Sequence, residues 1–183
     1  DRLKANSIEI EHKNMKKLYL RAYKVNFDDW MNRKYRYLGS VHVDDLRDYM
    51  AANYYSISWD IDLVDPGDYK SHKTYIVPKI KEKGFYMIAA SVREDFKSYE
   101  KQNNTYHPNN ILATYITISN MVVVSQPLGK DWEVFVMDGK NGKPVYNASV
   151  TLYRYDYNRG PVEIRTIGTN KEGRSFFPNQ GNR

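Results

Sequence analysis

The sequence contains no cysteine. This absence excludes a disulfide framework, a zinc site with cysteine ligands and a thiol nucleophile from the chain. The sequence also lacks a run of about 18 apolar residues, the length of a membrane-spanning helix, and no secretory leader opens it. We therefore expect no membrane span in this segment. Its start at Asp1 instead of methionine indicates a segment of a longer precursor, so the rest of a longer parent chain is an expected partner.

Disorder is excluded by the composition. Apolar residues make up 41% of the chain and aromatic residues 14%, including 17 tyrosines, which is too hydrophobic for a disordered protein. A length of 183 residues suits one large β-domain or two sandwiches of roughly 90 to 100 residues each. Cysteine-free proteins rich in tyrosine and asparagine are common among exported bacterial β-proteins. We therefore expect export, to the periplasm or to the cell surface.

A clustered basic surface is missing as well, although the net charge is +6. Residues 37–68 carry 1 basic and 7 acidic groups and separate two basic blocks, 1–36 and 69–104. A phosphate-binding face requires clustered lysine and arginine side chains. We interpret the charges as solvated strand faces and loops, and we expect no nucleic-acid partner.

Short strands separated by turn signals run through the first half of the chain. Residues 7–11 and 17–25 are predicted strands, with a hairpin as the simple interpretation. The clearest strand is 55–63, in which apolar residues alternate with serine and aspartate. A further strand is predicted at 73–77. Residues 85–92 are apolar on both faces, as in the middle of a sandwich sheet.

Residues 27–52 interrupt this pattern. Val43, Leu46 and Met50 recur at helical spacing, and Asp44 and Asp45 would stabilise a helix N-terminus. We predict an insertion with one short helix.

The polar stretch 97–110 has no periodicity, and it places the predicted domain boundary between residues 103 and 104. Beyond this boundary the sequence predicts several short strands. Turn signals separate them about every 8 to 12 residues, and no helical segments alternate with the strands. The predicted strands are 111–119, 121–125, 132–137, 149–155, 162–167 and 174–177. The expected fold is therefore all-β, with two immunoglobulin-like sandwiches in tandem, 1–103 and 104–183.

Two stretches of the second half form a recognisable pattern. Gly142-Lys143-Pro144 leads into Ala148-Ser149-Val150-Thr151-Leu152-Tyr153, and Thr169-Asn170-Lys171-Glu172-Gly173-Arg174-Ser175-Phe176 follows. The pattern resembles the macroglobulin-type domains of bacterial α2-macroglobulin-like proteins, with Asn170 where the family usually has aspartate. A turn tolerates this change, because both side chains cap backbone amides. In the first half, 17–25 and 83–89 resemble the opening and closing strands of such a domain.

The resemblance implies a scaffold role in a protease-trapping inhibitor, with target proteases as partners. Family members are cleaved in a bait segment and change shape, and many react through a thioester built on cysteine and glutamine. Without cysteine this segment cannot contain the thioester, and the resemblance supplies no functional residues. We therefore expect a chain that is not an enzyme and has no cofactor.

Candidate chemistry is sparse. His12, His42, His72 and His107 show no metal-ligand spacing, although His42 with Asp44 and Asp45 could bind a cation. Four aspartates, Asp60, Asp62, Asp65 and Asp68, superficially resemble a calcium loop, but they lack the terminal glutamate of an EF-hand, and we favour a strand face followed by a turn. No serine lies in a nucleophile elbow, and no glycine-rich phosphate loop is present.

The tyrosines support the alternative function, a carbohydrate-binding or adhesin-type module. Exposed aromatic residues mark interfaces or sugar-stacking platforms, although tyrosine also suits half-buried strands. The candidates are Tyr19, Tyr23, Tyr54, Tyr153, Tyr155 and Tyr157.

Overall fold

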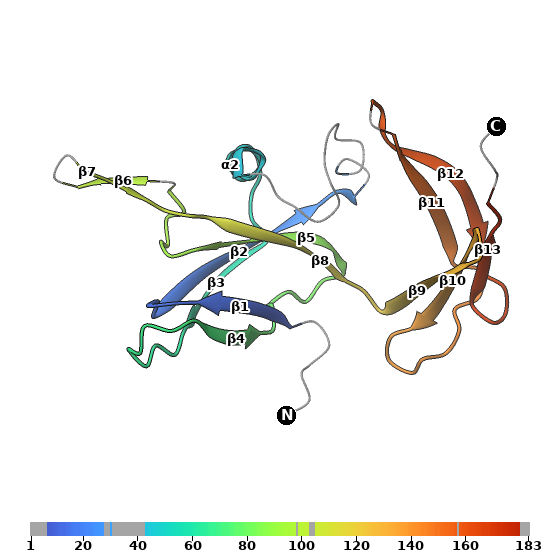
Figure 1. Cartoon of the computed structure of the whole chain (residues 1–183), viewed down its shortest axis with the longest axis horizontal. Coiled ribbons are helices and arrows are strands. Elements are labelled where there is room, and N and C mark those ends of the chain that lie inside the picture. Colours follow the sequence, from blue (N-terminus) through green and yellow to red (C-terminus); the bar gives the residue numbers. More distant parts are fainter. Residues whose placement is uncertain are drawn as a thin grey trace. The chain divides into compact units, whose positions relative to one another are not determined.

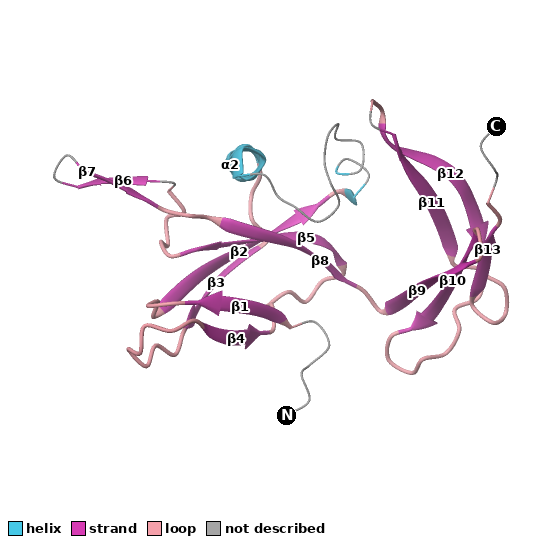
Figure 2. Ribbon diagram, viewed as in Figure 1, coloured by secondary structure: helices cyan, strands magenta, loops and turns pink. Residues whose placement is uncertain are grey.

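The computed structural model describes residues 7–27, 30, 43–97, 99–102, 105–156 and 158–179. Two compact units divide the chain: Asp1–Asn26 with Tyr37–Ile118, and Phe27–Arg36 with Ser119–Arg183. Strands dominate both units (Figures 1 and 2), which confirms the all-β fold predicted from the sequence.

The first unit is built on a four-stranded antiparallel sheet in the order β3-β2-β5-β8. Strand β2 lies inside the sheet because it pairs with both β3 and β5, and its alternating apolar residues Leu18, Leu20 and Ala22 are buried on one face. Strand β5 is buried on both faces, as its sequence predicts. The bounds are β2 Lys17–Val25, β3 Ile57–Asp62, β5 Gly84–Ser91 and β8 Leu112–Ile118.

A two-stranded sheet of β1 (Ile8–His12) and β4 (His72–Ile76) forms a second layer on this unit. Its apolar face, including Ile8 and Ile10, packs on a core formed by residues of the larger sheet and Ile76. The predicted hairpin of residues 7–11 with 17–25 is wrong. Both edges of β2 are taken by β3 and β5, so β1 pairs instead with β4, more than 60 residues along the chain. The buried members of the core are Leu20, Ala22, Trp59, Ile76, Tyr86 and Ile88.

The predicted insertion contains helix α2, Val43–Ala52, which confirms the short helix. Leu46 is 1% exposed, and the ring of Tyr49 meets the ring of Tyr23 edge to face, with centroids 6.1 Å apart. The Tyr49 hydroxyl also donates to the carbonyl of Lys24 at 3.3 Å. The helix therefore contacts the face of β2 that is opposite the β1–β4 layer.

The polar stretch at 97–110 is more regular than its sequence suggests. Strands β6 (Tyr99–Gln102) and β7 (Thr105–Pro108) form an antiparallel hairpin there. Strand β8, which follows, pairs with β5 from Gly84 to Ala90. The contacts of the chain thus group residues up to Ile118 with the first unit, whereas the sequence places the domain boundary at 103/104.

The second unit contains a three-stranded sheet in the order β13-β10-β9 and a two-stranded sheet of β11 and β12. Strand β10 is central, and its residues Val134 and Val136 are buried with Phe177 of β13. The β11–β12 pair covers this core with partly buried apolar side chains such as Val150 and Leu152. The bounds are β9 Met121–Leu128, β10 Asp131–Asp138, β11 Ser149–Asp156, β12 Gly160–Gly168 and β13 Arg174–Phe177.

Candidate functional site

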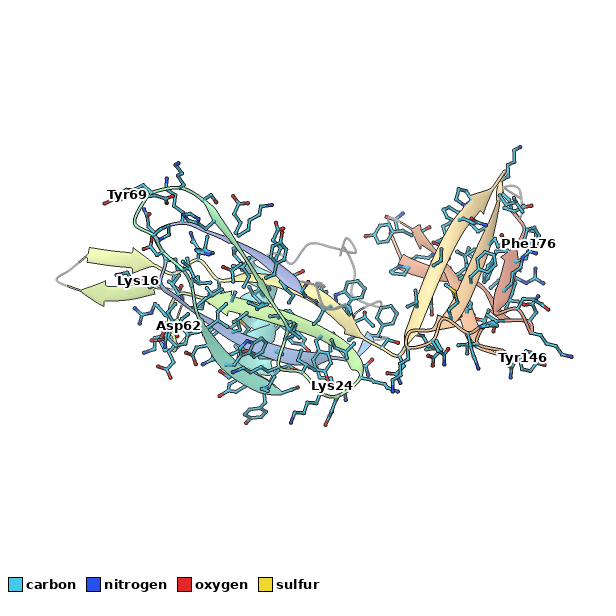
Figure 3. All side chains as sticks on the ribbon, turned by 90° about the horizontal axis from the view of Figure 1, so that it is seen from below. Lys16, Lys24, Asp62, Tyr69, Tyr146 and Phe176 are labelled. Carbon is cyan, nitrogen blue, oxygen red and sulfur yellow. The ribbon has the colours of Figure 1, made fainter. Side chains whose placement is uncertain are left out.

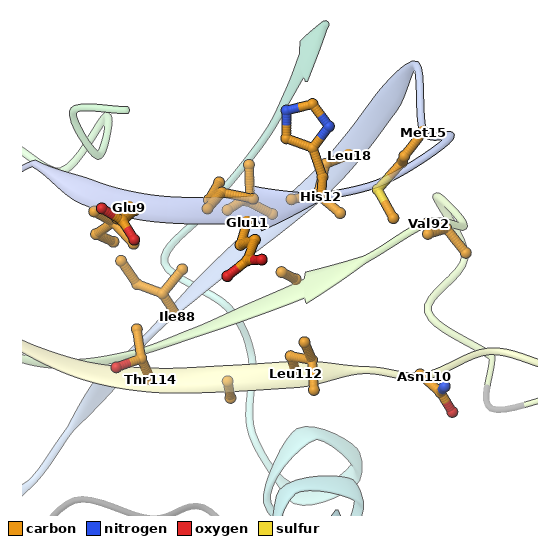
Figure 4. Close-up of a pocket in the computed structure, with 15 residues that line it drawn as sticks. Glu9, Glu11, His12, Met15, Leu18, Ile88, Val92, Asn110, Leu112 and Thr114 are labelled. Atoms are coloured by element: carbon orange, nitrogen blue, oxygen red, sulfur yellow. The ribbon is translucent and has the colours of Figure 1, made fainter. Parts of the chain in front are cut away.

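An apolar groove runs along strand β1 in the first unit (Figure 4). Its volume is about 350 Å³, within the range of about 300 to 1,000 Å³ that is usual for ligand pockets. All of β1, from Ile8 to His12, lines one side, and β5 and β8 supply the floor with Ile88, Ala90, Leu112 and Thr114. We call this feature the β1 groove.

The β1 groove exists because the two sheets of the unit differ in width. Two strands lie against four, and the start of β8, with Leu112 and Thr114, is left uncovered beside β1, whereas Ile116 and Ile118 pack on the core. Leu112 pairs with Ala90 and Thr114 with Ile88, so these residues share the face that bears the core. Leu112 is nevertheless 71% exposed, which is unusual for a leucine on an inner sheet face.

Two carboxylates stand on the outer face of β1, at the rim of the groove. Glu9 accepts a hydrogen bond from the Tyr75 hydroxyl at 2.5 Å, and it forms an ion pair of 2.8 Å with Lys73. Hydrogen bonds from Lys73 and then from Tyr75 lower the pKa of Glu9, so its carboxylate is charged at neutral pH. Glu11 accepts a hydrogen bond of 2.6 Å from the Ser71 hydroxyl. Among the described lining residues there is no lysine or arginine, so the charge facing the groove is negative.

His12 lines one end of the groove and His72 lies beside it, but their contacts do not form a hydrolase site. His12 is 5% exposed, and its Nε2 lies 3.0 Å from the Thr74 hydroxyl. His72 faces it across the strands, with ring centroids 6.1 Å apart, and its Nε2 lies 2.7 Å from the Asp68 carboxylate. A catalytic triad needs one histidine between a carboxylate and a hydroxyl. Here the carboxylate and the hydroxyl contact different histidines.

The aspartates that resemble a calcium loop have separate partners. Asp60 and Asp62 project from the exposed face of β3, where both pair with Lys17 at 2.9 and 3.8 Å. Asp65 caps the backbone N–H of Gly67, and Asp68 that of Lys70. The favoured interpretation, a strand face followed by a turn, is therefore confirmed. Within the described ranges, no three histidine, aspartate or glutamate side chains are grouped as a metal site would require.

The sequence pattern of the second half is a packing motif. The Asn170 side chain accepts hydrogen bonds from the backbone N–H groups of Glu172 and Arg174, as the capping interpretation predicts. Thr169 is 3% exposed, and its hydroxyl accepts from the N–H of Ala148 and donates to the carbonyl of Val145. These bonds tie the two halves of the pattern together, and neither half presents a reactive group.

The candidate tyrosines differ widely in exposure. Tyr23 is 2% exposed, so the prediction that it faces outward is wrong. Tyr54 is fully exposed in the first unit, whereas Tyr153 and Tyr155, at 40% and 42%, lie on β11 of the second unit. Two tyrosines outside this set, Tyr69 at 73% and Tyr146 at 67%, are more exposed than Tyr153 and Tyr155 (Figure 3). A stacking platform would need adjacent rings, and in the first unit the ring of Tyr23 is buried while that of Tyr54 is exposed.

Several sequence-based candidates lie outside the described residues. These are His42 and Tyr157, together with the side chains of Asp44, Asp45 and His107. The cation site suggested for His42 therefore stays a prediction.

The β1 groove itself was not predicted from the sequence. The signal for it was present in Ile8-Glu9-Ile10-Glu11, where apolar and acidic residues alternate, but a strand pattern does not show which edge stays unpaired.

Among the described helical residues, no helix is both long and apolar enough to span a membrane.

Comparison with known proteins supports the fold. No protein-family model and no curated protein sequence matches the chain. A solved structure of native α2-macroglobulin from Escherichia coli that spans domains MG0-NIE-MG1 is similar, with a TM-score of 0.63 and 14% identity over 97% of this chain and 53% of that one. A second structure of the same protein, spanning domains NIE-MG1, has a TM-score of 0.61 and 13% identity. The match covers 95% of this chain and 79% of that one. The chain thus has an α2-macroglobulin-like fold and spans about half the length of the first solved chain.

Proposed function

We propose that the chain is a non-catalytic scaffold and interaction segment of a larger α2-macroglobulin-like protein. The observation that carries the proposal is the structural match, which extends over 97% of the chain with a TM-score of 0.63. The packing motif at 142–153 and 169–176 also supports it, because the residues that carry the family resemblance pack against the core of the second unit and form its turns.

The activity proposed for the parent protein is protease inhibition. It is inferred from the resemblance of the sequence pattern to macroglobulin-type domains and from the fold shared with an α2-macroglobulin. Export to the periplasm or the cell surface is part of the same proposal. The two sandwich domains are proposed to act as spacers and docking surfaces, with target proteases binding the parent protein.

The contacts of the titratable side chains support the proposal that the chain is non-catalytic. The histidines near the β1 groove contact a hydroxyl and a carboxylate separately, and the exposed aspartates pair with Lys17 or cap turns.

The test compares the complete product of the parent gene with this chain. Each is incubated with a panel of endopeptidases, and cleavage of a large protein substrate is followed. We expect the parent protein to suppress cleavage, and the isolated chain neither to suppress it nor to hydrolyse the substrate. Stoichiometric inhibition by the isolated chain, or hydrolysis by it, would contradict the scaffold role.

A further inference from the structure

Among the strands that the structure describes, none pairs with the second edge of β1. Strand β1 pairs with β4 on one side, in the order β1-β4, and its other side faces the β1 groove along all 5 residues. An edge strand presents alternate backbone N–H and C=O groups that can pair with an added strand. No described residue of β4 lines the groove, so the edge next to the cavity belongs to β1.

The floor of the groove has the polarity that an added strand would require. A strand beside β1 would lie over β8 and cover Leu112 and Thr114, both of which are exposed. Successive side chains of a strand point to opposite faces, so every second residue would project down toward Ile88, Ala90 and Leu112. These inward residues must be apolar, because the floor offers little but hydrocarbon for them to contact.

The outward residues of such a strand would lie beside two carboxylates. Glu9 and Glu11 are exposed on the outer face of β1, on the side away from the core. Residues directly opposite each other on one face of an antiparallel pair have Cβ atoms about 4.5 to 5.5 Å apart, and opposite charges there are favourable. Lys73 already pairs with Glu9 from the β4 side, but the two carboxylates still outnumber that single cation. Lysine or arginine on the added strand would balance the charge.

We propose that the β1 groove binds an extended strand of a partner polypeptide in which apolar and basic side chains alternate. The strand extends the β1–β4 sheet along its open edge, buries its apolar residues on β5 and β8, and pairs its basic residues with Glu9 and Glu11. This assignment goes beyond the proposed function. It depends on the groove of the first unit alone, and it stands or fails whether or not the parent protein inhibits proteases.

The test uses two labelled synthetic peptides and fluorescence anisotropy. The probe is Thr-Val-Lys-Val-Arg-Val-Thr, and the control, Thr-Val-Glu-Val-Asp-Val-Thr, has the same apolar residues with reversed charge. We expect the basic peptide to bind the 183-residue chain at least about tenfold more tightly, because like charges opposed across an interface are strongly unfavourable. Replacing Glu9 and Glu11 together by glutamine should remove most of this difference.

Two further variants separate strand addition from general ion pairing. Leu112→Asp places a charge on the exposed floor of the groove and should abolish binding, whereas Leu128→Asp changes a leucine that is 50% exposed in the other unit and should leave binding intact. Basic peptides with N-methyl groups at alternate residues should also lose affinity, because they cannot complete the β ladder. Circular dichroism checks that every variant remains folded.

Defined outcomes overturn the proposal. Equal affinity for both peptides, or binding that survives Leu112→Asp in a folded protein, excludes the groove as the site. The chain's own first six residues, Asp-Arg-Leu-Lys-Ala-Asn, are the competing occupant, because their sequence also alternates basic and apolar residues. Binding that emerges only when residues 1–6 are deleted would assign the groove to that segment and not to a partner.

Discussion

Leu20 and Leu112 are leucines of the same sheet in very different surroundings. Leu20 is 2% exposed in the core of the first unit, whereas Leu112 is 71% exposed. We expect Leu20→Ala to lower the free energy of unfolding by about 2 to 5 kcal/mol, because it removes buried surface and leaves a cavity. Leu112→Ala is the matched control and should change it by less than about 0.5 kcal/mol. Urea denaturation followed by tryptophan fluorescence measures both, and equal losses would show that the core is misplaced.

Two glycines with positive φ separate backbone strain from steric clash. Gly142 has φ 69° and open space where an added methyl group would lie, whereas at Gly173, with φ 71°, a Cβ atom would lie 2.5 Å from the Val136 carbonyl oxygen. We expect Gly142→Ala to cost about 1 kcal/mol from strain alone. Gly173→Ala should cost more than about 2 kcal/mol, because overpacking adds to that strain. Thermal denaturation of the two variants gives the comparison, and a smaller loss at Gly173 would contradict the turn geometry.

Asp95 makes the free energy of unfolding depend on pH in the acid range. Hydrogen bonds from the Arg93 guanidinium, and then from the N–H of Lys97, hold the pKa of Asp95 well below its usual range. A lowered pKa in the folded state stabilises the protein above the unfolded-state pKa of about 4, and this contribution is lost as the pH falls through the folded-state value. The advantage of the native chain over Asp95→Asn should therefore be constant above about pH 5 and narrow as the pH falls below about 4.

Urea titrations of both proteins at several pH values test this expectation. Arg93→Gln removes the principal donor and should reduce the acid dependence in the same way. A stability advantage of the native chain over Asp95→Asn that grows as the pH falls would contradict this prediction.

At the scale of elements, β9 is an exposed edge strand of the second unit. Among the described strands it pairs only with β10, each of its 8 residues is exposed, and no charged residue lies between Ser119 and Gly129. Uncharged, apolar edge strands associate through their free hydrogen-bonding groups. The hairpin register places Val123 opposite buried Val136.

We expect the chain to associate at high concentration, and Val123→Lys to suppress this association. Because Val123 is 61% exposed, the substitution should change stability by no more than about 0.5 kcal/mol. Sedimentation velocity over a concentration series measures the association. Val64→Lys, at a 78% exposed position of the first unit, is the control, and equal suppression by both would remove β9 as the cause.

The local alternation of apolar and polar residues predicted where most strands of this chain lie. It did not predict which strands pair with each other. The alternation around Trp59 and the two apolar faces of β5 follow from side-chain periodicity, which burial imposes directly on a strand. The pairing of β1 with β4 depends on contacts across about 60 residues, and nothing in a single strand encodes them. The β1 groove was missed for the same reason, since it results from the unequal width of two sheets. The capping role of Asn170 was predictable because it is local.

At the scale of the whole chain, β8 decides how far the first unit extends. The whole of β8 pairs with residues Gly84 to Ala90 of β5. We expect a fragment of residues 1–118 to unfold cooperatively, and a fragment of residues 1–103, ending at the boundary proposed from the sequence, to lose cooperativity because β5 is left as an open edge. Circular dichroism during urea titration compares the two. Equal cooperativity would favour the boundary at 103/104.

The pairing of β1 with β4, and not with β2, creates the second layer and the groove of the first unit. Nuclear Overhauser contacts between the strands of the isotope-labelled chain test it most directly. We expect contacts between Ile10 and Thr74 across β1–β4, between Tyr23 and Met87 across β2–β5, and between Phe135 and Val124 across β9–β10. Contacts between β1 and β2 in place of the first set would contradict the account, because they would remove the second layer and the groove with it.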